Sequence, residues 1–157
     1  MRDTRVVFVE GVLGAGKSTT VARIVGRLTE RGVTAQRVSE GDDQLRVTAQ
    51  LPHGYTPWLD LSPGQYIARC QKNWRAFASS RQGTDGMTVC DGLLFHGNMT
   101  DLLLMDADAA AVASYYETVL RELSALRPSL IYLRVGDVAR TIREVCIERG
   151  RPGKSAR

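Results

Sequence analysis

The stretch that decides the fold is Arg5–Thr20, which reads RVVFVEGVLGAGKSTT. Its first part, Arg5–Glu10, contains an unbroken apolar run, which is typical of a strand buried on both faces of a parallel sheet. A glycine-rich turn follows at once. Beyond the turn, apolar side chains recur at helical spacing, which predicts a helix over Lys17–Arg31 that Gly32 ends. The sequence therefore predicts a strand, a tight turn and a helix in direct succession.

The turn itself, Gly11–Ser18, fits the pattern G-x-x-x-x-G-K-S/T. Glycines let successive backbone N–H groups point at one phosphate, and the following helix presents its positive end to the same anion. Lys17 can reach the β- and γ-phosphates, and the Ser18 hydroxyl can bind Mg²⁺. The alternative, an incidental lysine in a glycine-rich turn, is disfavoured by the strand before it and the helix after it. We therefore predict that ATP and Mg²⁺ bind here, and the predicted nucleotide-binding residues are Gly11, Leu13, Gly14, Ala15, Gly16, Lys17, Ser18 and Thr19.

The rest of the chain alternates strands with helices. Further strands are predicted over Val33–Glu40, over Met87–Cys90 with Asp91 at the end, and over Leu130–Val135. Further helices are predicted from the N-cap Ser62 to Ser80, over Asp108–Leu126, and from the cap Asp137 to Arg149, and Gln44–Leu61 is predicted to be irregular. This order predicts one domain over 1–157 with a three-layer α/β P-loop NTPase fold, in which a parallel sheet of about four strands has helices on both faces.

Composition and charge narrow the class of protein. A net charge of +4, with its excess near the C-terminus and no aromatic–basic RNA-binding motif, favours a small anionic ligand and no nucleic acid polymer. The longest apolar stretch, Leu102–Ala113, is interrupted by Asp106 and Asp108, so no membrane span is expected. Three widely spaced cysteines and the lack of a signal-peptide pattern favour a cytoplasmic protein.

Phe8-Val9-Glu10-Gly11, running into Gly14-Ala15-Gly16-Lys17-Ser18-Thr19, resembles the opening of the thymidylate kinase and deoxynucleoside kinase group of P-loop kinases. Val38–Glu40 resembles the acidic end of that group's second strand, and Val89–Asp91 resembles its third functional strand. Tyr132–Arg134 and Glu148–Arg151 resemble the strand and the arginine-bearing lid entrance. The resemblance implies an ATP-dependent phosphotransferase that acts on a nucleoside, a nucleotide or another small hydroxylated molecule. It also implies a lid that begins near residue 149 and is incomplete here, so we expect either an abbreviated C-terminal part or a sequence that is a fragment of a longer protein.

The same resemblance suggests catalytic roles beyond Lys17. Asp91 would hold Mg²⁺ through water, a role that we favour over the alternative of a carboxylate in a turn before Gly92. Glu40 would accept the proton of the attacking hydroxyl, with Asp42 as the competing candidate and a solvated loop as the alternative for both. Arg149 and Arg151 would stabilise the transferring phosphoryl group. The group usually carries Arg directly after the strand-end acid, and this chain has Gly92 there.

The sequence patterns that point to residues binding the phosphate acceptor are less specific. Glu10 precedes the loop and can orient a substrate hydroxyl or support Mg²⁺. Alternatively, it is a strand-end charge bound to the loop's own N–H groups. Trp58 lies in a long loop and can stack on a base or pin that loop to the core. Arg69 and Lys72 can bind an anionic acceptor or form a solvated helix face. His96 edges the same crevice or is a single exposed loop histidine.

Two questions are left open by these patterns. A P-loop protein that binds nucleotide with slow or no hydrolysis is the second functional class, which the shortened lid and Gly92 favour. Two copies can also pair through the helix at Asp108–Leu126 to form a homodimer.

Overall fold

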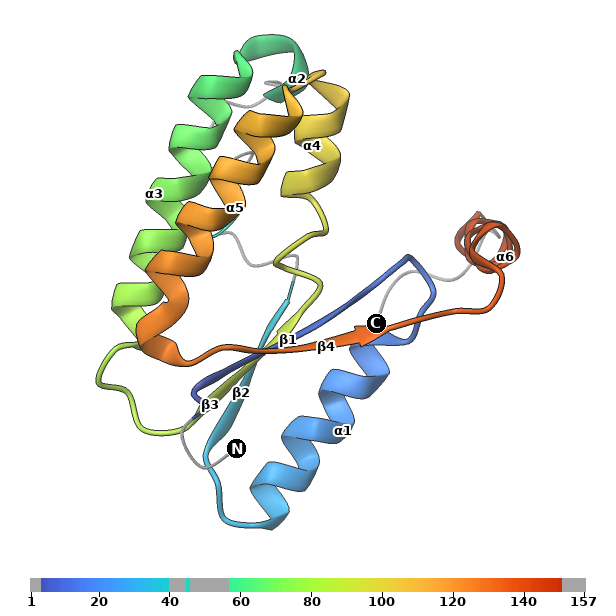
Figure 1. Cartoon of the computed structure of the whole chain (residues 1–157). Coiled ribbons are helices and arrows are strands. Elements are labelled where there is room, and N and C mark those ends of the chain that lie inside the picture. The colour runs from blue at the N-terminus through green and yellow to red at the C-terminus, as the bar shows by residue number, and fades with distance from the viewer. Residues whose placement is uncertain (1–3, 40–44, 46–56, 151–157) are drawn as a thin grey trace.

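The structure, a computed structural model, describes residues 4–39, 45 and 57–150 (Figure 1). Its elements, in chain order, are β1 (Val6–Gly11), α1 (Lys17–Glu30), β2 (Ala35–Ser39), α2 (Pro57–Asp60), α3 (Pro63–Arg81), β3 (Met87–Asp91), α4 (Asn98–Leu104), α5 (Ala109–Leu123), the 3-10 helix η2 (Ser124–Leu126), β4 (Ser129–Leu133) and α6 (Val138–Arg149). All four predicted strands and all four predicted helices are present. Two helices, α2 and α4, were not predicted, and the helix predicted to reach Leu126 ends in a turn of 3-10 helix.

The four strands form one parallel sheet in the order β2-β3-β1-β4. The strand that leads into the glycine-rich loop is central, between β3 and β4. Because all strands run the same way, their carboxyl ends meet at one edge of the sheet, which is where ligands bind in open α/β sheets. The predicted parallel sheet of about four strands is thereby confirmed.

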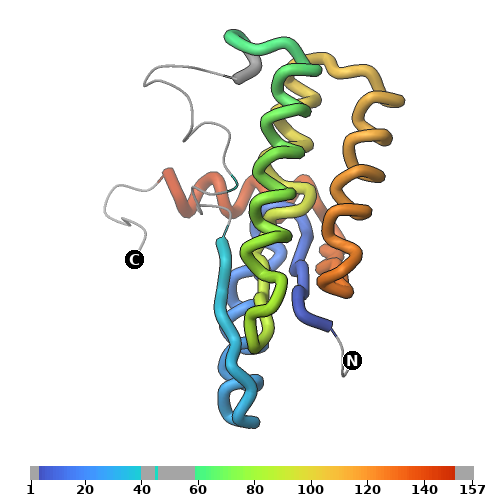
Figure 2. Tube along the Cα trace, turned by 90° about the vertical axis from the view of Figure 1, so that its left-hand side faces the viewer, coloured from blue at the N-terminus to red at the C-terminus, as the bar shows by residue number. Residues whose placement is uncertain are grey.

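Side chains along β1 alternate between two cores, one on each face of the sheet. Val6 and Phe8 belong to a cluster built with α3, α4 and α5, whereas Val7 and Val9 pack with Val21 of α1. Figures 1 and 2 show α3 and α5 side by side on one face, and Figure 1 shows α1 on the other. The unbroken apolar run of β1 is therefore explained by burial on both faces, which makes this a three-layer α/β domain.

Helix α3 begins where its sequence predicts. The Ser62 side chain accepts from the Gln65 N–H at 3.3 Å, and the Gln65 side chain accepts from the Ser62 N–H at 2.9 Å, which completes a capping box. Pro63 follows as the first helical residue. Trp74 of α3 packs against the sheet, with its ring centroid 6.0 Å from that of Phe8 in β1.

A buried polar network ties α3 to α4 and α5. Tyr66 Oη donates to Asp101 at 2.5 Å and to Asn98 Oδ1 at 3.2 Å. Tyr115 Oη accepts from Trp74 Nε1 and from Asn98 Nδ2, each at 3.0 Å. Buried polar groups need such partners, so the network holds α4, and the loop that precedes α4, in one position.

No helix among the described residues combines the length and the apolar character that crossing a membrane requires.

Candidate nucleotide and acceptor site

The loop between β1 and α1 has the backbone shape that its glycines permit. Gly14 and Gly16 have φ values of +83° and +86°, which glycine adopts far more readily than other residues. Gly16 is the N-cap of α1, with no side-chain cap. Thr20 N–H donates to Gly16 O at 3.0 Å, which is the first hydrogen bond of the helix. The backbone N–H groups of residues 17–19 come before it and have no acceptor within the helix. These amides, together with the positive end of α1, form the kind of site that binds a phosphate group.

Lys17 lies over this loop. Its side chain is 8% exposed, and Nζ donates to the carbonyl oxygens of Gly11 at 3.0 Å and Val12 at 3.3 Å. Neutral carbonyls compensate a buried ammonium only in part, so a phosphate anion beside Lys17 would improve its electrostatic environment. The predicted phosphate-binding lysine is therefore positioned at the loop.

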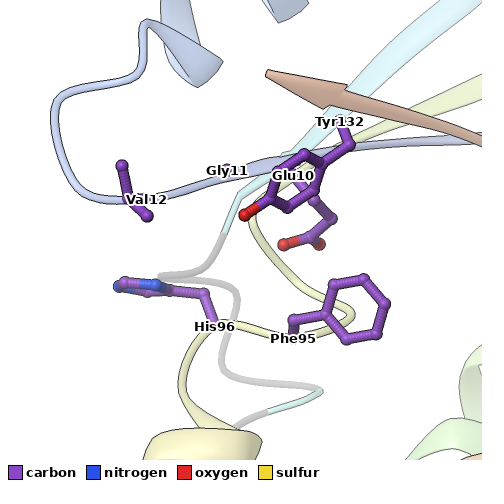
Figure 3. Close-up of a pocket in the computed structure, with 6 residues that line it drawn as sticks. All are labelled: Glu10, Gly11, Val12, Phe95, His96 and Tyr132. Carbon is purple, nitrogen blue, oxygen red and sulfur yellow. The ribbon is translucent and has the colours of Figure 1, made fainter. Parts of the chain in front are cut away.

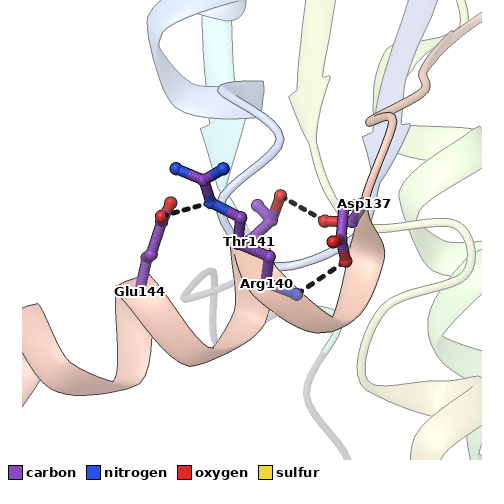
Figure 4. A network of polar contacts seen from close by, with 4 residues as sticks. All are labelled: Asp137, Arg140, Thr141 and Glu144. Atoms are coloured by element: carbon purple, nitrogen blue, oxygen red, sulfur yellow. Dashed lines mark hydrogen bonds and ion pairs between the residues drawn. The ribbon is translucent and has the colours of Figure 1, made fainter.

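Helix α6 rests against the same loop. A Cβ atom added at Gly14 would lie 2.6 Å from Cγ2 of Val145 and 2.9 Å from Cγ2 of Thr141. The first turn of α6 is ordered by Asp137, whose side chain accepts from Arg140 N–H at 2.9 Å and whose carbonyl accepts from the Thr141 hydroxyl at 2.7 Å (Figure 4). The N-cap predicted from the sequence thus helps to place Thr141 against the glycine-rich loop.

Asp91, at the end of β3, is 4% exposed and forms an ion pair across the sheet. Its Oδ2 accepts from Arg37 Nη2 of β2 at 2.6 Å. The strand register pairs Ser39 with Asp91 and Arg37 with Val89, so Arg37 lies two residue pairs earlier along the same two strands. Arg37 is about half exposed, and its charge compensates a carboxylate that burial would otherwise destabilise.

The predicted magnesium ligands, Ser18 and Asp91, supply oxygen atoms, which Mg²⁺ prefers. Within the described residues, no group of three or more His, Cys, Asp or Glu side chains forms a metal cage. Mg²⁺ commonly binds through one or two protein oxygens together with waters and substrate phosphates. The donor set therefore fits a magnesium ion that arrives with a nucleotide, with Ser18 and the Asp91 carboxylate as its protein partners.

A pocket opens directly beside the start of the loop (Figure 3). It has a volume of about 170 Å³ and is lined by Glu10, Gly11, Val12, Phe95, His96 and Tyr132. The strand end, the loop after β3 and the neighbouring strand β4 all contribute. Because Gly11 and Val12 belong to both the pocket and the glycine-rich loop, a molecule in the pocket would lie next to the predicted phosphate site.

Glu10 is the acid of this pocket, and it is only 1% exposed. Its Oε1 accepts from the Leu94 backbone N–H at 2.6 Å. Burial raises the pKa of Glu10 above its usual value, and the charge of Asp91 adds to this rise. The Leu94 and Phe95 amides and the charge of Lys17 act in the opposite direction. Glu10 therefore lies within electrostatic reach of both Lys17 and Asp91.

The other predicted site residues fall into two groups. Arg69 and Lys72 of α3 and Arg149 at the end of α6 are exposed, and none of them lines the pocket. The structure therefore does not bring them together with Glu10. The second group, Glu40, Asp42, Arg151 and the side chain of Trp58, lies outside what the structure describes.

Three site residues were not assigned a role from the sequence. Arg37 is one charged residue in a polar stretch of β2, and Phe95 is one aromatic residue in a loop. Tyr132 belongs to the resembling strand, but nothing in the sequence places its ring beside Glu10. The register of β1 and β4, which pairs Glu10 with Tyr132, creates that neighbourhood. For His96 the sequence left two alternatives, the edge of the crevice or a single exposed loop histidine, and in the structure it lines the pocket and is half-buried.

Comparisons with known proteins bear on the fold. No model of a protein family matches the chain, and no curated protein matches its sequence. Among solved structures, the protein APE1195 is similar with a TM-score of 0.55 and 16% sequence identity, over 95% of this chain and 72% of that one. The APS kinase CysC of Mycobacterium tuberculosis gives a TM-score of 0.46 and 13% identity, over 92% of this chain and 96% of the kinase. The thymidylate kinase of Candida albicans gives 0.46 and 10%, over 94% and 92%.

The similarity to APE1195 establishes that the two proteins share a fold and carries no information about substrate. The two kinases have lower TM-scores. This similarity, together with the strand, the glycine-rich loop and the helix described above, gives the chain a three-layer α/β fold of the P-loop kind.

Proposed function

We propose that this protein is an ATP-dependent phosphotransferase that moves the γ-phosphate of ATP to a small hydroxylated molecule. One observation carries the proposal: the pocket lined by Glu10, His96 and Tyr132 shares Gly11 and Val12 with the glycine-rich loop, and we assign this pocket to the phosphate acceptor. A phosphotransferase needs its two substrates in contact, because most of the rate enhancement in this chemistry comes from positioning and electrostatic stabilisation.

In the proposed reaction, the loop amides and Lys17 hold the β- and γ-phosphates. An oxygen of the acceptor attacks the γ-phosphorus in line, a new O–P bond forms, and the bond to the β,γ-bridging oxygen breaks so that ADP leaves. Bound Mg²⁺ would neutralise phosphate charge, with Ser18 and Asp91 as its protein partners. Glu40 or Asp42 as proton acceptor, and Arg149 and Arg151 as phosphate partners, remain part of the proposal.

The proposal is tested by ATP turnover with a panel of nucleosides, nucleotides and other hydroxylated metabolites. Acceptor-stimulated release of ADP, with a phosphorylated product seen by mass spectrometry, is the expected result. Equal ADP release with and without every acceptor would contradict it.

Lys17→Ala tests the phosphate site separately. Loss of a charged hydrogen-bond donor to the phosphates is expected to weaken ATP binding about 10- to 100-fold, because such bonds contribute about 1.5–3 kcal/mol. The matched control is Arg121→Ala, which removes one positive charge from the exposed last turn of α5. Titration calorimetry with ATP and Mg²⁺ measures both. Unchanged affinity in Lys17→Ala would remove the basis of the proposed site.

The second candidate is a nucleotide-binding protein without transfer activity. The Arg37–Asp91 ion pair favours it, because one oxygen of the predicted metal-binding carboxylate already has a partner. Tight ATP binding without acceptor-stimulated turnover would support this candidate over the first.

A further inference from the structure

The acceptor pocket has an unusual balance of charge for a protein that handles phosphates. Its side chains are the Glu10 carboxylate, the rings of Phe95 and Tyr132, and the imidazole of His96. None of the described residues that line it is Arg or Lys. The cation whose charge acts on Glu10 is Lys17, which the loop carbonyls hold at the phosphate site. A second anion, Asp91, is close enough to act on Glu10 as well.

This balance distinguishes between two kinds of acceptor. A phosphate monoester carries close to two negative charges at neutral pH and is held in proteins by Arg, Lys or clustered backbone amides. In this pocket the nearest acid is buried, and the Leu94 amide is already bonded to that acid. Like charges within a few ångströms in a site of low dielectric repel strongly. A phosphate group beside Glu10 would therefore be unfavourable.

A neutral hydroxyl or an ammonium group beside Glu10 would be favourable, because it can donate a hydrogen bond to the carboxylate. Glu10 Oε1 accepts from Leu94 N–H, yet an ionised carboxylate has two oxygens and about four acceptor positions. Capacity therefore remains for a hydroxyl or ammonium donor. Tyr132 is 53% exposed, so its ring offers an apolar face at the rim of the pocket.

We propose that Glu10 selects the phosphate acceptor by charge, so that the pocket admits neutral or cationic hydroxyl compounds and rejects phosphate monoesters. Glu10 orients the acceptor by accepting a hydrogen bond from its hydroxyl or ammonium group. This proposal rests on the function proposed above and deepens it by naming the chemical class of acceptor. It assigns the pocket to acceptors that have not yet been phosphorylated.

The test uses matched pairs of compounds that differ only in a phosphate: thymidine and thymidine 5′-monophosphate, adenosine and AMP, and glucosamine and glucosamine 6-phosphate. The full chain is first saturated with the non-hydrolysable analogue AMP-PNP and Mg²⁺, so that no monophosphate can occupy the loop. Titration calorimetry at pH 8 then measures each affinity. In each pair that binds, the unphosphorylated member is expected to bind at least tenfold more tightly.

Two variants test whether the charge of Glu10 causes the preference for unphosphorylated compounds. Glu10→Gln keeps a carbonyl oxygen for the Leu94 amide but removes the charge, and it is expected to reduce the preference to less than threefold. Glu122→Gln makes the same change of charge on α5, where Glu122 pairs with Arg75, and it should leave the preference at the wild-type value. The wild-type ratio tests the proposal even if Glu10→Gln does not fold, which thermal unfolding reveals.

Three outcomes would overturn the inference: tighter binding of the monophosphates, an unchanged preference in folded Glu10→Gln, or no binding of any unphosphorylated compound to the AMP-PNP complex. Each leaves nucleotide binding and ATP turnover intact. Failure of AMP-PNP to bind at all is a different result, because it refutes the proposed function and this inference with it.

Discussion

At the scale of single residues, the end of β1 carries two opposite constraints in succession. Glu10 is a carboxylate in an almost fully buried position, which costs stability unless partners compensate it. Gly11 lies against β4, where an added Cβ would come within 2.7 Å of the Leu133 carbonyl oxygen. Glu10 is thus an acid whose ionised form burial disfavours, and the position of Gly11 has no room for a side chain. Such local costs concentrate at functional sites.

The buried charge of Glu10 predicts how stability depends on pH. Its folded-state pKa is raised, mainly by burial, so the folded state favours the protonated form. Its stabilising contribution is therefore present below the unfolded pKa and is lost as the pH rises through the folded pKa. Relative to wild type, Glu10→Gln should therefore become more stable as the pH rises above the unfolded pKa of Glu10. Urea unfolding at several pH values measures this difference, and a gap that shrinks with rising pH would contradict the burial argument.

At the scale of elements, helix α6 keeps its position without a buried face. None of its residues is buried, yet Thr141 and Val145 lie against the backbone of Gly14. Figure 2 shows α6 running across the direction of α3 and α5. Its position therefore depends on its capped first turn and on the glycine-rich loop rather than on a deep core. A change in the loop should be transmitted to α6, which carries Arg143 and Arg149.

Gly14→Ala tests this contact. The new Cβ would overlap Val145 and Thr141, and φ at this position is +83°, a conformation that costs a non-glycine residue about 1–2 kcal/mol. ATP affinity and the free energy of unfolding should both fall, and adding Val145→Ala should recover part of the loss. Titration calorimetry and urea unfolding measure the two quantities.

The control is Gly26→Ala on α1, where no atom lies within 4 Å of the added Cβ. It should raise stability by about 0.5–1 kcal/mol, because alanine favours a helix interior more than glycine does. If Gly14→Ala behaved like Gly26→Ala, α6 would not rest on the loop.

At the scale of the whole molecule, the sheet separates two cores of different character. The core toward α1 is aliphatic, whereas the core toward α3, α4 and α5 contains the rings and the buried hydrogen bonds of Tyr66, Trp74 and Tyr115. That second core supports the loop after β3, which supplies Phe95 and the Leu94 amide to the pocket. A cytoplasmic location and pairing of two copies through α5 stay predictions.

Tyr115→Phe tests the buried network. The change leaves Trp74 Nε1 and Asn98 Nδ2 without their acceptor, and each unsatisfied buried group costs about 1–3 kcal/mol. Thermal unfolding should show a decrease of about 2–4 °C for each kcal/mol lost in a chain of this size. Tyr132→Phe, at a half-exposed ring, is the control and should change stability little. Equal effects of the two substitutions would argue against the network.

By itself, the sequence determined the local features of the protein. The run Val6–Val9, the glycine-rich loop, the Ser62 capping box and the Asp137 cap each depend on residues within a few positions of one another, so their physical causes are present in the local sequence. Helix α4 escaped prediction for the same reason, because its N-cap is Gly97, without a side-chain cap, and its start carries no local signal.

Only the tertiary structure decided which distant residues meet. Arg37 pairs with Asp91 because β2 and β3 are neighbours in a particular register, and Tyr132 reaches Glu10 because β4 pairs with β1. The seating of α6 on Gly14 is a contact of the same kind. Strand order and register follow from how the whole chain buries its apolar surface, and a shift of one residue would turn every side chain of a strand to the opposite face. No local pattern contains that information, so the sequence indicated a phosphate loop, whereas the acid, the rings and the ion pair beside it required the fold.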